Sequence, residues 1–292
     1  MNGDKERQRL IDHMRAWLDA LAARDFRGLK FAPGFRNTEN TVELPVGVGL
    51  CRTLQRIWDD GHYFVDVATG QVEYWGVADE PGRETVFAVR LKVAGNLIAE
   101  AETMTSRGKG EYFVPSMIAT GTPGFHDVLP PEQRISREAL IEVAHLYFDG
   151  IERSDGSIVP SRPDALRLVN GKEDAGDTAD LDEDRKYRAL SVQEQISKGY
   201  YSYIEALRGR RAIVADVERG IVLFHVMFDH PADHSTEDGT LPWPDPNTVM
   251  AFEAFKVVGG EIQTVWAIGA GYPYGIRSGW GDGELRRIAA LS

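Results

Sequence analysis

The sequence predicts an α+β fold made of two tandem copies of one unit, in each of which helices cover one face of a curved antiparallel sheet. Three pairs of segments indicate this, because each pair aligns without a gap and the pairs follow the same order along the chain. A repeat of this length means that each copy is one structural unit. The pairs are 10–25 with 140–155, 64–81 with 214–231, and 86–104 with 250–268.

The first pair is predicted to form amphipathic helices. LIDHMRAWLDALAARD and LIEVAHLYFDGIERSD share their opening Leu-Ile and their closing aspartate. In the first copy, apolar residues recur at helical spacing and form one stripe for packing on a sheet. The stripe consists of Leu10, Met14, Trp17, Leu18 and Leu21.

The other two pairs are predicted to form hairpins. The second pair turns at Gly70 and Gly220, and the third pair turns at Gly95 and Gly259. Alternating apolar residues on both sides of a glycine turn are typical of antiparallel strands. Each copy therefore consists of a helix, a loop, a short helix and a meander of strands, which is an α+β unit.

The boundary between the copies is predicted in TPGFHDVLPPEQR, where turn residues and a Pro-Pro pair interrupt any regular element. The first domain then covers residues 1–125 and the second covers 134–292. Ser136 is the expected N-cap of the first helix of the second domain.

Composition excludes several classes of function. The chain of 292 residues has 33 basic and 45 acidic residues, a net charge of −12, so we expect neither a nucleic-acid nor a membrane partner. The single cysteine, Cys51, excludes an internal disulfide, and no apolar stretch has the length of a membrane span. Because the charged start MNGDKERQRL contains no secretory signal, we expect a cytoplasmic protein.

The repeat resembles the nuclear transport factor 2-like (SnoaL-like) superfamily in a tandem form. RNTENTVELPVGVGLCRT (36–53), followed by FAVRLKVAGNLIAEAETMTSR (87–107), is similar to the lignin-derived diarylpropane γ-formaldehyde lyases. The resemblance implies two cone-shaped domains and a lyase without a cofactor. Such an enzyme converts a phenolic 1,2-diarylpropane-1,3-diol, a small aromatic substrate, into a stilbene, formaldehyde and water.

Two alternatives stay open, because this superfamily hosts many activities on one scaffold. One is another cofactorless dehydratase, isomerase or cyclase, and the other is a non-catalytic ligand-binding double domain. Sheets of this type often leave a face that associates with another sheet, so we also expect a homo-oligomer.

The first copy is expected to carry the catalytic pocket. At aligned positions it has Arg90, Glu100 and Glu102, where the second copy has Ala254, Thr264 and Trp266. The second copy is not free of acids, since Glu253 aligns with Val89. The segment RNTEN (36–40) corresponds roughly to RLVNG (167–171), which keeps an arginine but lacks an equivalent of Glu39.

The Gly95-Asn96 turn predicts the register of the third hairpin in the first copy. A two-residue turn would pair Leu91 with Glu100 and Val89 with Glu102, which places both acids on an apolar face. Arg90 would then lie on the opposite face. In an apolar pocket burial would raise the pKa of these acids, but an ion pair of Glu100 with Arg36 or Arg107 is the structural alternative.

These patterns give a set of candidate site residues. Glu102, with Glu39 as its rival, is the expected acid–base group, and Arg36 or Arg90 would stabilise an oxyanion. The candidate catalytic residues are Glu102, Glu39, Arg36, Arg90, Glu100 and Tyr74. The candidate substrate-binding residues are His13, Trp17, Phe35, Asn40, Trp75 and Phe113, although most of the aromatic residues and His13 also fit a core, and Asn40 also fits a turn.

No metal site is expected. FDHPADHSTED (228–238) contains Asp229, His230, Asp233 and His234, but their spacing matches no closed zinc pattern. GAGYPYGIRSGW (269–280) lacks the strand–turn–helix context of a dinucleotide-binding loop. The expected cofactor content is therefore none.

Overall fold

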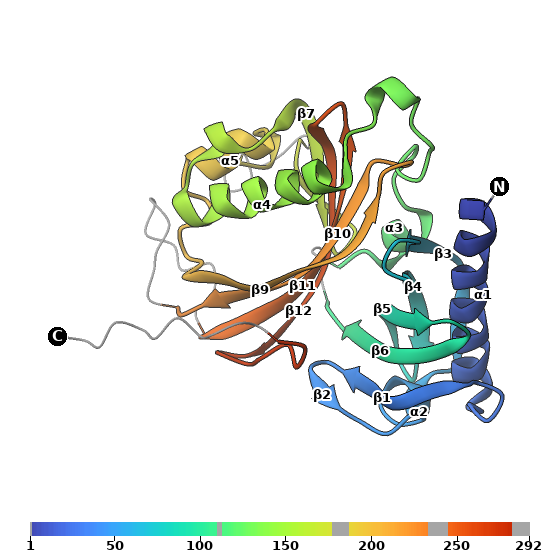
Figure 1. Ribbon diagram of the computed structural model, residues 1–292. Helices are drawn as coiled ribbons and strands as arrows, with labels where there is room; N and C mark the ends of the chain where they lie inside the picture. Colours follow the sequence, from blue (N-terminus) through green and yellow to red (C-terminus); the bar gives the residue numbers. More distant parts are fainter. Residues whose placement is uncertain (1, 110–112, 177–186, 233–244, 282–292) are drawn as a thin grey trace.

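The computed structural model describes residues 2–109, 113–176, 187–232 and 245–281, and it contains two six-stranded sheets (Figure 1). The sheets have the same strand order, β2-β1-β6-β5-β4-β3 in the first unit and β8-β7-β12-β11-β10-β9 in the second. The predicted α+β class and the repeat are thereby confirmed. One detail differs, because each sheet is mixed: β1 runs parallel to β6, and β7 runs parallel to β12.

The first unit contains three helices and six strands: α1 (Asn2–Ala23), β1 (Phe31–Glu39), β2 (Val42–Glu43), α2 (Leu50–Thr53), β3 (Arg56–Asp66), β4 (Gln71–Glu80), β5 (Arg83–Ala94), β6 (Leu97–Ser106) and α3 (Pro115–Thr120). A short 3-10 helix, η1 (Pro131–Gln133), lies in the connection to the second unit.

The second unit repeats this order: α4 (Arg137–Arg153), η2 (Gly156–Ile158), β7 (Ser161–Val169), β8 (Lys172–Ala175), α5 (Val192–Ser197), β9 (Ala206–Asp216), β10 (Ile221–His230), β11 (Asn247–Val258) and β12 (Glu261–Pro273). Ser136 caps α4 as expected, because its side chain accepts a hydrogen bond from Ala139 N at 3.2 Å. Within the described ranges, no helix combines the length and apolarity needed to cross a membrane.

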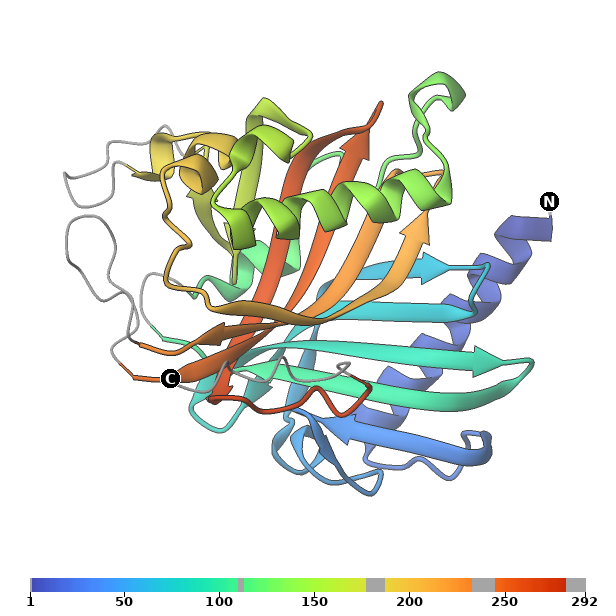
Figure 2. The same cartoon turned by 60° about the vertical axis from the view of Figure 1, so that its left-hand side comes forward.

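The molecule has four layers. Figure 2 shows the two sheets stacked on each other, with α1 (blue) on the outer side of the first and α4 (green) on the outer side of the second. Separate cores fill the spaces beneath the two helices. A third core joins the sheets, with Trp75 and Met104 from the first unit and Phe252 and Trp266 from the second. The sheet face that we expected to associate is therefore buried against the sister unit.

Equivalent glycines are required at one turn in both units. Gly70 and Gly220 have φ of 68° and 59°, a region that residues with a side chain rarely adopt. A Cβ atom at these positions would lie 2.7 Å from Val93 O and 2.2 Å from Val257 O. Each glycine carbonyl in turn accepts a hydrogen bond from the same valine, so the turn and the neighbouring hairpin are locked together.

The predicted register of the 86–104 hairpin is wrong beyond its first pairs. Val93 pairs with Ile98 as predicted, but Lys92 pairs with Glu100 and Arg90 pairs with Glu102. Ala99 is therefore one extra residue in β6, a β-bulge that shifts the following residues to the opposite face. The second unit has the same irregularity between Lys256 and Val257.

The bulge decides where the two glutamates point. Val89 and Leu91 face the core beneath α1, whereas Arg90 and Glu102 share the face that packs on the second sheet. The carboxylates thus lie between the units. They do not lie in the cone of the first unit, the space between its sheet and α1.

Candidate active site

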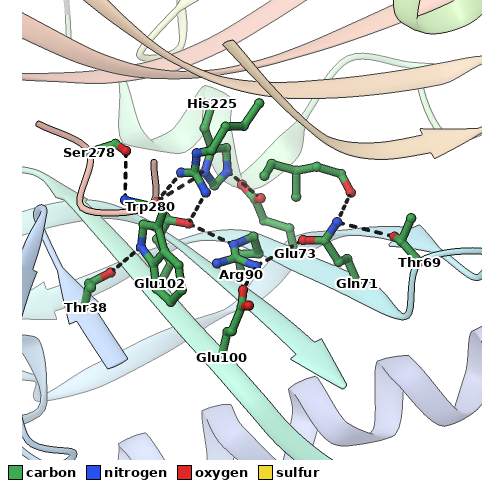
Figure 3. Close-up of polar contacts among 12 residues, drawn as sticks. Thr38, Thr69, Gln71, Glu73, Arg90, Glu100, Glu102, His225, Ser278 and Trp280 are labelled. Atoms are coloured by element: carbon green, nitrogen blue, oxygen red, sulfur yellow. Dashed lines mark hydrogen bonds and ion pairs between the residues drawn. The ribbon is translucent and has the colours of Figure 1, made fainter. Parts of the chain in front are cut away.

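Glu100 and Glu102, the acids of the 86–104 hairpin, belong to an ionic network between the two sheets (Figure 3). Glu102 is 3% exposed and accepts hydrogen bonds from Arg90 Nε at 2.8 Å and from Arg211 Nη2 at 2.6 Å. Burial alone would raise the pKa of Glu102, but its basic neighbours, among them His225, outweigh burial and hold that pKa well below its usual value. Glu102 therefore forms buried ion pairs, a structural role that the sequence analysis had considered for Glu100.

His225 joins this network to a second buried acid. Its Nε2 lies 2.7 Å from Glu73 Oε2, and its Nδ1 lies 3.2 Å from Arg211 Nη2. The other carboxylate oxygen of Glu73 accepts a hydrogen bond from Trp75 Nε1 at 2.6 Å. Strands of both units thus contribute to one continuous set of polar contacts inside the apolar interface.

Arg90 and Arg36 share an aromatic partner from the far end of the chain. The Trp280 ring lies 4.7 Å from the guanidinium carbon of Arg90 and 4.5 Å from that of Arg36. Trp280 Nε1 also donates to Thr38 Oγ1 at 2.9 Å (Figure 3). The segment after β12 therefore fastens the second unit onto β1 of the first.

The partner of Glu100 is Arg90, neither Arg36 nor Arg107. Glu100 Oε2 lies 2.7 Å from Arg90 Nη1, and Glu100 is 37% exposed in its side chain. Arg36 instead pairs with Glu43 at 2.9 Å, and Arg107 pairs with Glu80.

The first unit has a small cavity between α1, β1 and α2. Its cavity measures about 20 Å³, which is room for about one water molecule. Glu39 lines this cavity and accepts a hydrogen bond from Leu50 N at 2.8 Å. Burial raises the pKa of Glu39, although the Leu50 hydrogen bond opposes this. A catalytic role of Glu39 stays a prediction, and the small cavity disfavours a substrate beside it.

The remaining candidates of the first unit occupy core and surface positions. Tyr74 is 3% exposed and packs 5.7 Å from the Phe87 ring, and burial raises its pKa. Phe35 packs 4.4 Å from Phe31. Asn40 has a φ of 51°. Its Nδ2 donates to Thr105 Oγ1 and its Oδ1 accepts from Thr105 N, both at 2.9 Å. Asn40 therefore acts as the turn former that the sequence also allowed.

The other four substrate-binding candidates lie in different places. Trp17 borders the small cavity of the first unit, and His13 is half-buried in an open surface groove. Trp75 lies in the core between the sheets, and Phe113 packs against that core. Our six substrate-binding candidates are therefore not brought together around one pocket.

The second unit contains a larger pocket beneath its helix layer, with a volume of about 110 Å³. Every residue that lines it belongs to the second unit, and most of the lining is apolar or aromatic. Its polar groups are few and converge from different strands, which is the usual composition of a small-molecule site. The lining includes Arg167, Tyr201, Tyr203, Phe228, His230 and Glu253.

Glu253 is the acid of this pocket. It lies on β11 between Phe224 of β10 and Ala267 of β12, and it is 4% exposed. Its Oε2 has no hydrogen-bond partner among the described residues. Burial raises the pKa of Glu253 to about 7, although the charge of Arg167 opposes the rise. The carboxyl group is thus close to half-protonated at neutral pH.

Arg167 is the cation of the pocket. It lies on β7, its side chain is 11% exposed, and its Nη2 lies 3.1 Å from Asp174 Oδ2. Its guanidinium carbon lies 4.5 Å from the centre of the Tyr201 ring. Nε and Nη1 have no hydrogen-bond partner within the described ranges. Two donor nitrogens are therefore left for a ligand.

A row of buried groups holds this arginine in place. The Tyr201 hydroxyl donates to Gln195 Oε1 at 2.7 Å, and Gln195 Nε2 donates to Asp174 O at 2.6 Å. Gln195 is fully buried. Because Tyr201 stacks on Arg167 and Asp174 pairs with it, Gln195 orients both of its supports.

Two further polar groups face the same region. The Tyr147 hydroxyl, on α4, is buried near Arg167; burial raises the pKa of Tyr147, and the charge of Arg167 opposes the rise. His230 stacks on Tyr203 with ring centres 5.5 Å apart. Burial lowers the pKa of His230 to about 4, so this imidazole is neutral at pH 7.

The sheet register explains why the sequence comparison of the two arginines was wrong. Arg36 lies opposite Glu100, and the residue opposite the equivalent Thr264 is Leu166, not Arg167. Arg167 instead occupies the position of Asn37. A shift of one residue turns a strand side chain to the other face, so Arg167 points into its cone while Arg36 points away from its own.

A sequence signal for Glu253 did exist. It interrupts the row of alternate residues Ala251, Phe255 and Val257, all of which are buried beneath α4. An acid in such a row is either paired or functional, and the comparison with Val89 shows that the acid occurs in the second copy alone.

Among the described residues no group of three or more metal-ligating side chains occurs. Asp233 and His234 of the 228–238 segment lie outside the described residues.

Comparisons with known proteins assign no activity to this chain. A family model described as "Domain of unknown function (DUF8021)" matches residues 133–269, which is just under half of the chain. The match falls on the second unit. A search of curated proteins gives no match.

Several solved structures are similar to one unit. AclR, a candidate hydroxylase from Streptomyces galilaeus, is 15% identical, with 47% of this chain and 83% of AclR covered, at a TM-score of 0.33. A candidate SnoaL-like polyketide cyclase from Jannaschia sp. CCS1 is 10% identical, with coverages of 49% and 90%, at a TM-score of 0.33. AusH from Aspergillus nidulans is 12% identical, with coverages of 46% and 86%, at a TM-score of 0.30. Similarity at this level carries no assignment of activity.

Proposed function

We propose that this protein is a cofactor-independent enzyme that performs acid–base chemistry on a small aromatic compound in the pocket of the second unit. One observation supports this above all: Glu253 lines an apolar cavity together with Arg167, where its Oε2 has no hydrogen-bond partner among the described residues and burial raises its pKa to about 7. A carboxyl group in this state is near its optimum as both acid and base at neutral pH. No structural need for an acid is visible there, because Glu253 Oε2 has no hydrogen-bond partner among the described residues.

Glu253 and Arg167 have complementary roles in this proposal. Protonated Glu253 donates to a leaving oxygen, and the resulting carboxylate removes a proton in the next step. Arg167 stabilises negative charge that develops on the substrate, since its two free nitrogens are fixed donors in a dry site. The aromatic rings of the lining, such as Tyr201 and Phe228, pack against the substrate.

The specific reaction that we propose is the release of formaldehyde from a phenolic 1,2-diarylpropane-1,3-diol. Glu253 gives its proton to the benzylic hydroxyl, the C–O bond breaks, water leaves, and the deprotonated phenol supplies electrons to form a quinone methide. The Glu253 carboxylate then takes the proton of the terminal hydroxymethyl group. The C–C bond breaks, formaldehyde leaves, and the electron pair restores the phenolate and forms the stilbene double bond. One carboxyl group thus serves both steps.

The first experiment measures formaldehyde and stilbene after purified protein is mixed with such a diol. Glu253→Gln, which keeps the shape of the side chain, is expected to lower turnover by about 100-fold or more. Glu39→Gln tests the rival acid in the first unit. Turnover that is lost in Glu39→Gln and kept in Glu253→Gln would place the chemistry in the first unit instead.

A wild-type protein that releases no formaldehyde would reject the lyase reaction but not the wider acid–base proposal. The wider proposal has a test that needs no substrate. Infrared difference spectra between pH 6 and pH 8 should show a protonated carboxyl band that disappears in Glu253→Gln. If the two proteins give the same spectra, Glu253 is not the titrating acid and the proposal fails.

A further inference from the structure

The pocket of the second unit has an excess of hydrogen-bond donors. Arg167 lines the pocket and offers Nε–H and Nη1–H groups, neither of which has a hydrogen-bond partner among the described residues. Arginine has no acceptor atom, and a carboxyl group in its protonated form adds one more donor. Buried donors without partners are costly, so a ligand that fills this cavity has to bring acceptor oxygens.

The volume of the cavity limits the ligand to about one ring. It measures about 110 Å³, and a cavity of about 150 Å³ in another protein accommodates benzene. Tyr203, Ile204 and Val249, which line the cavity, are half-buried and thus reach the surface. A larger compound would therefore place one ring inside and extend past these residues.

The aromatic lining also determines the shape of the ligand. Tyr201 already carries the Arg167 guanidinium on its ring face, and Phe228 and Tyr203 border the rest of the cavity. A planar ring packs against such surfaces, and its in-plane substituent then reaches the edge of the guanidinium.

We infer that the ligand of this pocket is a one-ring aromatic oxyanion, a carboxylate or a phenolate, whose charged oxygen is bound by Arg167. This inference rests on the proposed function in that it names the substrate class of the same pocket. In a diaryl substrate the bound ring would be the phenolic one, with its phenolate oxygen at Arg167.

The protonation state of Glu253 links binding to pH. A second negative charge in the cavity repels an anionic ligand, so binding is expected to weaken as pH rises through about 7, the pKa of Glu253. The charged and titratable groups packed around this carboxyl come from α4, β7, β8, the segment after α5, and β10: Tyr147, Arg167, Asp174, Tyr201, Tyr203 and His230. Of these, Arg167 is the one that directly opposes the rise in the Glu253 pKa.

The test is titration calorimetry with benzoate and 4-nitrophenolate as anionic probes and with benzamide and benzyl alcohol as neutral probes of similar size. The anions are expected to bind at least tenfold more tightly than the neutral compounds. Arg167→Met should weaken the anions by about tenfold or more. Arg162→Met is the matched control, because Arg162 lies on the same strand but is 43% exposed in its side chain and paired with Asp164.

Each outcome decides one point. Preference for benzoate points to a carboxylate, and preference for 4-nitrophenolate points to a phenolate. Equal binding of neutral and anionic probes, no measurable binding of either anion, or anion binding unchanged in Arg167→Met overturns the inference. Anion binding without turnover of any diol retains the inference and rejects the lyase. Turnover of the diol that depends on Glu253 but is not inhibited by either anion retains the lyase and rejects the inference.

Discussion

Replacing Glu253 by glutamine is expected to change how the stability of the protein depends on pH. The folded state holds the proton of this carboxyl more tightly than the unfolded chain does, because burial raises its pKa from 4.5 to about 7. Below pH 4.5 both states are protonated and the full contribution is present. As pH rises through 7 the folded state must bury a charge or keep a proton that the unfolded chain has released, so stability falls.

The size of the effect follows from the two pKa values. The difference between 4.5 and about 7 corresponds to ~3 kcal/mol in the free energy of unfolding, at about 1.36 kcal/mol per pKa unit. Measurements are best made from pH 5.5 to 8.5, away from the isoelectric point near 5.1 where solubility is lowest. About 2 kcal/mol of the difference remains in that window.

The assay is urea unfolding followed by circular dichroism at several pH values for both proteins. The free energy of unfolding of the wild type, minus that of Glu253→Gln, should fall by about 2 kcal/mol between pH 5.5 and 8.5. Glu261→Gln, at an exposed position of the same sheet, controls for the loss of one acidic residue and should leave the wild-type curve unchanged in shape. Parallel curves for wild type and Glu253→Gln would refute the raised pKa and with it the proposed role.

Three other predictions concern the fold. Glu102→Gln should lower the free energy of unfolding by ~3 kcal/mol or more in urea titrations, because it leaves buried arginines without their partner, whereas the half-exposed Glu100→Gln should cost less than ~1 kcal/mol. Gly220→Ala should lower the melting temperature by several degrees, because its φ of 59° and the nearby Val257 carbonyl leave no room for a Cβ. The second unit produced alone, residues 134–292, should aggregate on size exclusion, because it exposes the face that includes the fully buried Trp266.

The sequence predicts the architecture well because the same pattern of turns and apolar residues occurs at equivalent positions of both copies. Glycine turns at Gly70 and Gly220 and the paired apolar stripes indicate the same helix and hairpins twice. These are local features, since a turn needs a residue with positive φ and a strand needs a period of two. No partner elsewhere in the chain has to be known to recognise them.

The direction of the side chains at the site could not be predicted in the same way. The Gly95-Asn96 turn is locally consistent with a regular hairpin, and nothing in NLIAEAETM marks Ala99 as the extra residue of a bulge. One added residue moves Glu102 from the cone to the interface between the sheets. The pairing of Glu102 with Arg211 then depends on the packing of the two units, which no local pattern encodes.

The pocket shows the same division between what is local and what is not. Glu253 is visible in the sequence as an acid in an apolar row, but its neighbour Arg167 lies on a strand nearly 90 residues earlier. Only the parallel pairing of β7 with β12 sets Arg167 opposite Val265. Val265 lies two residues before Ala267, the partner of Glu253, so Arg167 and Glu253 lie on the same face of the sheet. A parallel strand pair is joined by a long connection, so its register cannot be derived from a turn.

Equivalent strands therefore have different roles in the two units. Where the second unit has Glu253, the first has the buried Val89, and its small cavity measures about 20 Å³ against about 110 Å³ in the second. The first unit instead supports the strands of the pocket from behind: Ser106 Oγ donates to Gly269 O at 2.7 Å, and Val114 N donates to Asn170 O at 2.9 Å. Both acceptors lie on or beside β12 and β7, the strands that carry one wall of the pocket. The first unit thus holds that wall in place although it contributes no side chain to the pocket.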